Sequence, residues 1–159
     1  MHKPPTILYV DDDDNDVLLL KHALRCAKLI FDVQVVNDPE NASAYLDGDG
    51  KFSDRTLHPL PELVLLDLKM PRMHGLEILA WIRRHPRFKE LVVVVLTASN
   101  HVPEINRAYE LGANSYLIKP VELGELVGII RGMIAYWMRQ PTQATLERPR
   151  PGGRVSVQG

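Results

Sequence analysis

The sequence has a single cysteine, Cys26, and no long apolar run. One cysteine excludes an internal disulfide, and a lone thiol is typical of a reducing cytosol. No apolar run approaches the roughly 18–20 residues that a membrane-spanning helix needs. The first residues, MHKPPT, lack the charged-then-apolar pattern of a secretory signal peptide. We therefore expect a cytoplasmic protein without a membrane anchor.

The sequence also has little net charge, because 19 basic side chains nearly balance 20 acidic ones and give a formal charge of −1. Nucleic acids and anionic membrane surfaces attract proteins with a basic excess, so neither is expected as the main partner. Of the 159 residues, 45% are hydrophobic and 25% are charged, which is typical of one globular domain with a real core.

Short apolar runs that do not alternate with polar residues are the main structural signal. Such runs are typical of parallel strands covered by helices on both faces. A weaker fifth candidate, which we expect nearer an edge, spans residues 32–37. The four stronger candidate strands are residues 6–10, 63–67, 91–97 and 115–118.

Segments with helical spacing of apolar residues separate most of these runs. Strand and helix alternate about five times, which predicts an α/β fold with right-handed crossovers. We expect a flavodoxin-like, doubly wound sheet of five parallel strands in the order 2-1-3-4-5, with helices on both faces. The helical segments are residues 15–28, 75–84, 103–111 and 122–138.

Two segments fall outside this alternation. Residues 47–62 are rich in Gly, Asp and Pro and predict a long loop before the third strand. Residues 139–159 carry three prolines and three glycines and cannot form a core element, so their composition favours disorder. The expected organisation is one domain over residues 1–138 and a tail over residues 139–159.

Acidic residues cluster where two of the apolar runs end. Asp11 and Asp12 follow the first run, and Asp67 closes the third. Ligands of open parallel sheets bind beyond the carboxyl ends of the strands, so these acids are expected in one pocket. Two carboxylates about 4 Å apart repel by roughly 4 kcal/mol at an effective dielectric constant near 20. A divalent cation removes that repulsion, and Mg²⁺ prefers such oxygen ligands.

The alternative for an aspartate at a strand end is a helix N-cap, a role expected here for Asp13, Asp14 or Asn15. Two later strands end in Thr97 and Lys119, which adds a hydroxyl and an ammonium to the same edge. A metal site, a nucleophilic carboxylate, a hydroxyl and a cation together suit an aspartate that receives a phosphoryl group.

With these motifs, the sequence resembles the receiver domain of two-component response regulators over residues 6 to about 138. The matching motifs are VDDD (10–13), LLDLKMPRMHG (65–75), LTAS (96–99) and GANSYLIKP (112–120). The resemblance implies that Asp67 is the phosphoacceptor. It also implies that Asp12 binds Mg²⁺ directly, Asp11 mainly through water, and Lys69 through its backbone carbonyl.

The same resemblance implies that Thr97 and Lys119 contact the phosphoryl group and that Thr97 and Tyr116 form the conformational switch. It further implies a cis peptide between Lys119 and Pro120. Lys69 and Ser99 occupy positions that tune dephosphorylation in this family.

The long loop and the LLDLKMP motif are similar to those of single-domain regulators paired with phytochrome-type histidine kinases in bacteria. A sensor histidine kinase, of phytochrome type in particular, is therefore the expected partner. The tail is too short for a DNA-binding or enzymatic domain, so output is expected through a protein–protein surface that responds to phosphorylation.

The last helical segment suggests one such surface. Ile129, Met133 and Tyr136 lie about 100° around the helix from its main apolar stripe. We expect them to form a homodimer interface onto which the tail of the partner crosses. The alternative is extra core contact with a neighbouring helix.

Two other functions are consistent with parts of the pattern. A haloacid-dehalogenase-type phosphatase also uses a nucleophilic aspartate, but it needs an acid two residues later, where this sequence has Lys69. A receiver-like scaffold that is never phosphorylated is the second alternative, and the complete set of site residues argues against it.

Overall fold

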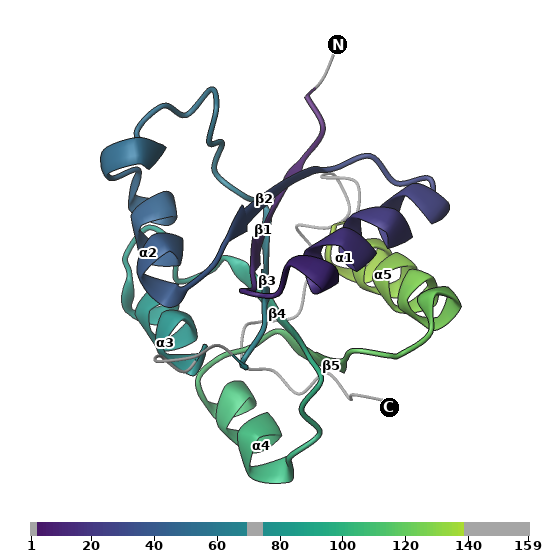
Figure 1. The fold of residues 1–159 in the computed structure, drawn as a ribbon. Coiled ribbons are helices and arrows are strands. Elements are labelled where there is room, and N and C mark those ends of the chain that lie inside the picture. Colours follow the sequence, from purple (N-terminus) through teal and green to yellow (C-terminus); the bar gives the residue numbers. More distant parts are fainter. Residues whose placement is uncertain (1–2, 70–74, 139–159) are drawn as a thin grey trace.

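The computed structural model describes residues 3–69 and 75–138. They form a five-stranded parallel sheet with the order β2-β1-β3-β4-β5, which confirms the predicted topology (Figure 1). The weaker candidate strand is β2, and it lies at an edge as expected. The strands are β1 (Thr6–Val10), β2 (Asp32–Val36), β3 (Leu63–Leu66), β4 (Val92–Thr97) and β5 (Ser115–Ile118).

Helices cover both faces of the sheet, with α1 and α5 on one face and α2, α3 and α4 on the other (Figure 1). The long loop before β3 contains a short 3₁₀ helix, η1 (Gly50–Phe52). The α-helices are α1 (Asp14–Cys26), α2 (Pro39–Asp47), α3 (Leu76–Arg84), α4 (Val102–Glu110) and α5 (Leu123–Trp137).

The core is divided into two layers by the sheet. Alternate residues of the strands point to opposite faces, so Ile7 and Tyr9 pack under α1 and α5, whereas Leu8 and Val10 pack on the α2–α4 side. Because both faces are covered, every residue of β1, β3 and β4 is buried. This explains why these strands read as continuous apolar runs in the sequence.

Helix α2 is an element that the apolar spacing does not reveal. Its boundaries do carry sequence signals: Asp38 is the N-cap, Pro39 follows at the first helical position, and Gly48 ends the helix with a φ of 72°. The loop after α2 is also more tightly packed than its composition suggests. Arg55 donates hydrogen bonds to three backbone carbonyls, which belong to Tyr45, Leu46 and His58.

The structure corrects the prediction for one face of α5. Met133 is only 5% exposed and belongs to the core between the sheet, α1 and α5, so it is not a surface residue. The reason is spacing, because Met133 follows Ile130 by three positions and precedes Trp137 by four, and these three residues share one helical stripe. The alternative, extra core contact, therefore holds for Met133. Tyr136 is exposed and Ile129 is half-buried.

Within the described ranges, no helix is both long enough and apolar enough to cross a membrane. Two expectations lie outside those ranges. They are the predicted tail over residues 139–159 and its proposed crossing onto a second copy of the chain.

Candidate functional site

The carboxyl ends of β1, β3 and β5 bring the predicted site residues to one edge of the sheet. Asp11 directly follows β1, Asp67 directly follows β3, and Lys119 directly follows β5. Backbone hydrogen bonds continue the ladders to these positions: the N–H of Asp67 donates to Val10, and that of Lys119 donates to Thr97. The parallel register of the sheet therefore fixes where each of these side chains begins.

The Lys119 ammonium lies among three carboxylates. Its Nζ is 2.8 Å from Asp11 Oδ2, 2.6 Å from Asp16 Oδ2 and 3.1 Å from Asp67 Oδ2. An ammonium has three N–H donors and no acceptor, so each carboxylate can receive one hydrogen bond. The Asp11 side chain is fully buried and that of Asp67 is 7% exposed. Lys119 thus compensates part of the charge that accumulates at this edge.

Protonation of Lys119 is favoured by these neighbours. Burial by itself lowers the pKa of the Lys119 ammonium, but hydrogen bonds to Asp11 and Asp16 and the charge of Asp67 outweigh burial and raise it above its ordinary value. The Tyr9 hydroxyl donates to Asp11 at 2.7 Å, and burial together with the Asp11 charge raises the pKa of Tyr9. Both donors stay protonated at neutral pH.

Asp16 is a site residue that the sequence analysis did not identify. It lies in the first turn of α1. The N-cap of this helix is Asp13, which is one of the three residues expected for that role. Asp13 accepts hydrogen bonds from the N–H groups of Asn15 and Asp16, which fixes this turn beside the sheet edge. Burial raises the pKa of the Asp16 carboxyl, and the contact with Lys119 opposes that rise. The only signal in the sequence was one more aspartate in the acidic run.

Oxygen atoms of Asp11, Asp16 and Asp67 all lie within 4.8 Å of one another. Carboxylate oxygens at this spacing are suitable ligands for a hard divalent cation. Asp12, the expected direct ligand, is exposed and is not part of this group. Lys69 is exposed too, and its N–H donates to Asp67 Oδ1 at 3.1 Å. The individual metal-binding roles of Asp12 and Lys69 remain predictions.

The two expected switch residues are both buried and both contact Ser99. Thr97 ends β4, and its Oγ1 accepts a long 3.5 Å hydrogen bond from the Ser99 N–H. Tyr116 is fully buried in β5, and its hydroxyl donates to the Ser99 carbonyl at 2.9 Å. The Tyr116 ring therefore points inward, and Ser99 links it to Thr97.

No cis peptide bond occurs in the part of the chain that the structure describes, so the bond before Pro120 is trans. The prediction of a cis bond at this position is therefore wrong. The trans form of such a bond is favoured by about 0.5–1 kcal/mol unless the surroundings oppose it. Here Lys119 reaches all three carboxylates with a trans bond.

Gly75 lies directly against the backbone of the acidic residue at the end of β3. A Cβ atom at this position would be 2.5 Å from the carbonyl oxygen of Asp67 and 3.1 Å from the Cα of Leu68. Real Cβ atoms do not approach backbone so closely, so a side chain at position 75 would crowd the site.

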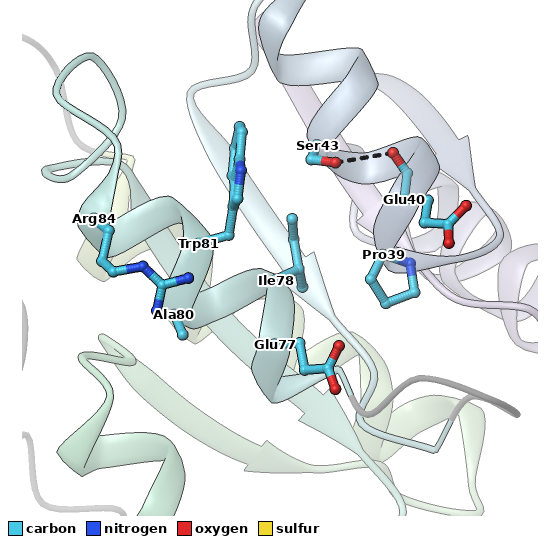
Figure 2. Close-up of a pocket in the computed structure, with 8 residues that line it drawn as sticks. All are labelled: Pro39, Glu40, Ser43, Glu77, Ile78, Ala80, Trp81 and Arg84. Atoms are coloured by element: carbon cyan, nitrogen blue, oxygen red, sulfur yellow. Dashed lines mark hydrogen bonds between the residues drawn. The ribbon is translucent and has the colours of Figure 1, made fainter.

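A separate groove of about 380 Å³ lies between α2 and α3 (Figure 2). It contains none of the residues predicted for the site. Its walls combine apolar side chains with three charged ones. The lining residues are Pro39, Glu40, Ser43, Glu77, Ile78, Ala80, Trp81 and Arg84.

Comparison with known proteins agrees with this fold. Residues 7–131 match the family model of the response regulator receiver domain. Response regulator Rcp1 of Synechocystis is 33% identical over 139 residues, which cover 87% of this chain and 92% of that protein. The chain therefore spans nearly the whole length of this relative.

Solved structures give the same result. Response regulator RPA3017, from red light signaling of R. palustris, superposes with a TM-score of 0.81 at 36% identity, covering 85% of this chain and 94% of that one. The phosphorylated cyanobacterial phytochrome response regulator RcpA has a TM-score of 0.77 at 33% identity, with 86% and 95% covered. A Mn²⁺-bound form of Rcp1 has a TM-score of 0.75 at 33% identity, with 86% and 96% covered.

The chain belongs to the response regulator receiver family. More narrowly, it is related to single-domain regulators, among them regulators associated with phytochromes. Receivers take part in two-component signalling, interact with histidine kinases and are in general signalling proteins rather than enzymes. The resemblance in the sequence is confirmed, and the phosphatase and scaffold alternatives are not favoured.

Proposed function

We propose that the chain is a stand-alone receiver that accepts a phosphoryl group on Asp67 from the phosphohistidine of a sensor kinase, in a Mg²⁺-dependent reaction. The observation that carries this proposal is the contact between the Lys119 ammonium and Asp67 Oδ2, 3.1 Å apart, beside two further carboxylates. A half-buried cation next to a strand-end carboxylate can balance the charge that a phosphoryl group brings.

In the proposed transfer, a carboxylate oxygen of Asp67 attacks the phosphorus atom. An oxygen–phosphorus bond forms, the phosphorus–nitrogen bond of phosphohistidine breaks, and the imidazole nitrogen keeps the bonding electron pair. Lys119 and the Thr97 hydroxyl donate hydrogen bonds to phosphoryl oxygens. Mg²⁺ held by Asp11, Asp12 and Asp67, with the carbonyl of Lys69, would neutralise charge on the transferred group.

Hydrolysis of the acyl phosphate, in which water takes the phosphoryl group and Asp67 recovers its carboxylate, returns the site to its starting state. The chain thus promotes its own phosphorylation and dephosphorylation. The receiver relatives support this assignment. So does Lys69, which stands two positions after Asp67, where a phosphatase of the haloacid-dehalogenase type needs an acid.

Output follows from the burial of Tyr116. In the proposed switch, a phosphoryl group draws the Thr97 hydroxyl toward it and favours the inward position of Tyr116. In that position the Tyr116 hydroxyl donates a hydrogen bond to the Ser99 carbonyl. The phosphoryl group then acts by shifting a population between two arrangements. Tyr116→Phe should leave phosphorylation intact and reduce the change in partner affinity that phosphorylation causes.

The proposed partner of the chain is a phytochrome-type histidine kinase in the cytoplasm. Relatives that are associated with phytochromes support this choice. A homodimer through α5, with the half-buried Ile129 and the exposed Tyr136, and through the tail over residues 139–159 is a further proposal. Tyr136→Glu should lower the apparent mass in light scattering at concentrations where the parent is dimeric. An unchanged mass would exclude this surface.

Acetyl phosphate provides the simplest test of the phosphorylation proposal. With Mg²⁺, the intact protein should gain the mass of one phosphoryl group, and the gain should disappear on brief alkaline treatment. EDTA should prevent the gain, and Asp67→Asn should abolish it. A parent protein that gains no mass would favour the scaffold function, whereas rapid turnover of unrelated phosphate esters would favour the phosphatase.

A further inference from the structure

The closest carboxylate to the Lys119 ammonium is that of Asp16, which the proposed transfer does not use. The Nζ–Oδ2 distance is 2.6 Å for Asp16, compared with 2.8 Å for Asp11 and 3.1 Å for Asp67. Asp11 and Asp67 stand at strand ends, whereas Asp16 belongs to α1. The contact therefore ties the lysine to a helix as well as to the sheet.

The number of donors on Lys119 limits what it can offer to a phosphoryl group. Its three N–H donors match the three carboxylates around it. While Asp11 and Asp16 each keep one donor, only the donor now directed at Asp67 can turn to a phosphoryl oxygen. Release of the Asp16 contact would provide a second charge-assisted donor, and such bonds are the strong ones.

We propose that Asp16 is a positioning residue that competes with the phosphoryl group for the Lys119 ammonium and thereby weakens the phosphorylated state. This proposal rests on the proposed function, because it assigns Lys119 to the phosphoryl group. Asp16 contacts neither substrate nor the phosphoacceptor in this role and acts only through the lysine.

Asp14 provides a matched control in the same turn of α1. It is also acidic, but it is exposed, and its side chain makes no hydrogen bond or ion pair within residues 3–69 and 75–138. Asp14→Asn removes the same charge from the same helix end and leaves the contacts of Lys119 intact. A general effect of charge would appear in both variants, whereas an effect through Lys119 would appear only in Asp16→Asn.

Beryllofluoride, which imitates a phosphoryl group on an aspartate, allows an equilibrium test. Its affinity can be measured by ¹⁹F NMR for the full chain at saturating Mg²⁺, with the Mg²⁺ affinity of each variant determined first. Asp16→Asn should bind it about tenfold more tightly, the usual effect of one hydrogen bond to a charged group. Asp14→Asn should bind it like the parent.

A second pair of variants tests whether the effect passes through the lysine. In a Lys119→Met background, adding Asp16→Asn should change the affinity for beryllofluoride by less than about twofold, since a coupling needs both partners. The inference is overturned if Asp16→Asn behaves like Asp14→Asn, or if its gain persists without Lys119. A parent protein that does not bind beryllofluoride would instead overturn the proposed function, and the inference with it.

Discussion

The Lys119 ammonium lies 3.1 Å from Asp67 Oδ2, although 52 positions separate the two residues in the sequence. Strand β4 lies between β3 and β5 in the sheet, so the lysine side chain has to reach across the end of β4. Its aliphatic stem makes this reach possible, and two more carboxylates hold the ammonium there. The charge balance of the site therefore depends on this lysine.

Replacement of Lys119 should make the stability of the protein depend on divalent metal. In Lys119→Met, the carboxylates of Asp11 and Asp67 lose their counter-ion, and one uncompensated buried charge costs about 3–5 kcal/mol. We expect a lower free energy of unfolding in EDTA and a larger increase on addition of Mg²⁺ than for the parent. Urea unfolding with and without Mg²⁺ measures both.

Lys21→Met is the control for this prediction, because Lys21 is an exposed residue of α1. Equal stability of Lys119→Met and Lys21→Met in EDTA would contradict the role of the ion cluster. The measurement can be made at neutral pH, because the pKa of Lys119 is raised in the folded state. The stabilisation that the protonated lysine provides is therefore present below the ordinary lysine pKa and is lost only in strong alkali.

Substitution of Gly75 should damage the site from the backbone side. In Gly75→Ala, the new methyl group has to displace the backbone at Asp67, so we expect a loss of stability of about 1–3 kcal/mol, the usual cost of overpacking. Labelling by acetyl phosphate should become slower as well.

Gly128→Ala makes the matching control, because a Cβ atom there meets nothing within 4 Å. Within helix α5, that change should raise stability by about 0.5–1 kcal/mol, since alanine favours the helix. Unfolding curves of the two variants should therefore shift in opposite directions, and a shift in the same direction would argue against the close contact at Asp67.

The stability of the protein should fall at alkaline pH because of Tyr45, which contacts the packed loop before β3. Its hydroxyl donates to the Pro59 carbonyl at 2.7 Å, and burial raises the pKa of Tyr45 to about 12. Because the pKa of Tyr45 is raised in the folded state, the stabilisation that its protonated hydroxyl provides is complete below the ordinary pKa of 10.0. This stabilisation is lost as the pH rises through the pKa of the folded state.

Tyr45→Phe tests this prediction. The variant should be about 1 kcal/mol less stable at pH 7, because the Pro59 carbonyl loses its donor. Between pH 10 and pH 12, the parent should lose more stability than the variant, so the two melting temperatures should converge. Parallel curves over this interval would contradict the assignment.

The sequence was sufficient for the sheet, because β1, β3 and β4 are buried on both faces and short apolar runs without alternation are typical of such strands. It was not sufficient for details that depend on three-dimensional contacts. Helix α2 has a weak apolar stripe and is marked mainly by its caps. Met133 was placed on the wrong face because two apolar stripes of α5 overlap, and only packing against α1 distinguishes them.

The same limit applies to the site. Strand ends could be read from the sequence, so Asp11, Asp67, Thr97 and Lys119 were predicted at one edge. Asp16 belongs to a helix, and its approach to Lys119 depends on how α1 begins after its N-cap. No local pattern specifies that angle of approach.

Reductive trapping of the modified residue tests the central claim most directly. After treatment with acetyl phosphate and Mg²⁺, borohydride converts an aspartyl phosphate to homoserine, which tandem mass spectrometry locates in a peptide. We predict homoserine at position 67 only, and none when EDTA replaces Mg²⁺. Homoserine at another aspartate, such as position 11 or 12, or at no position would contradict the account.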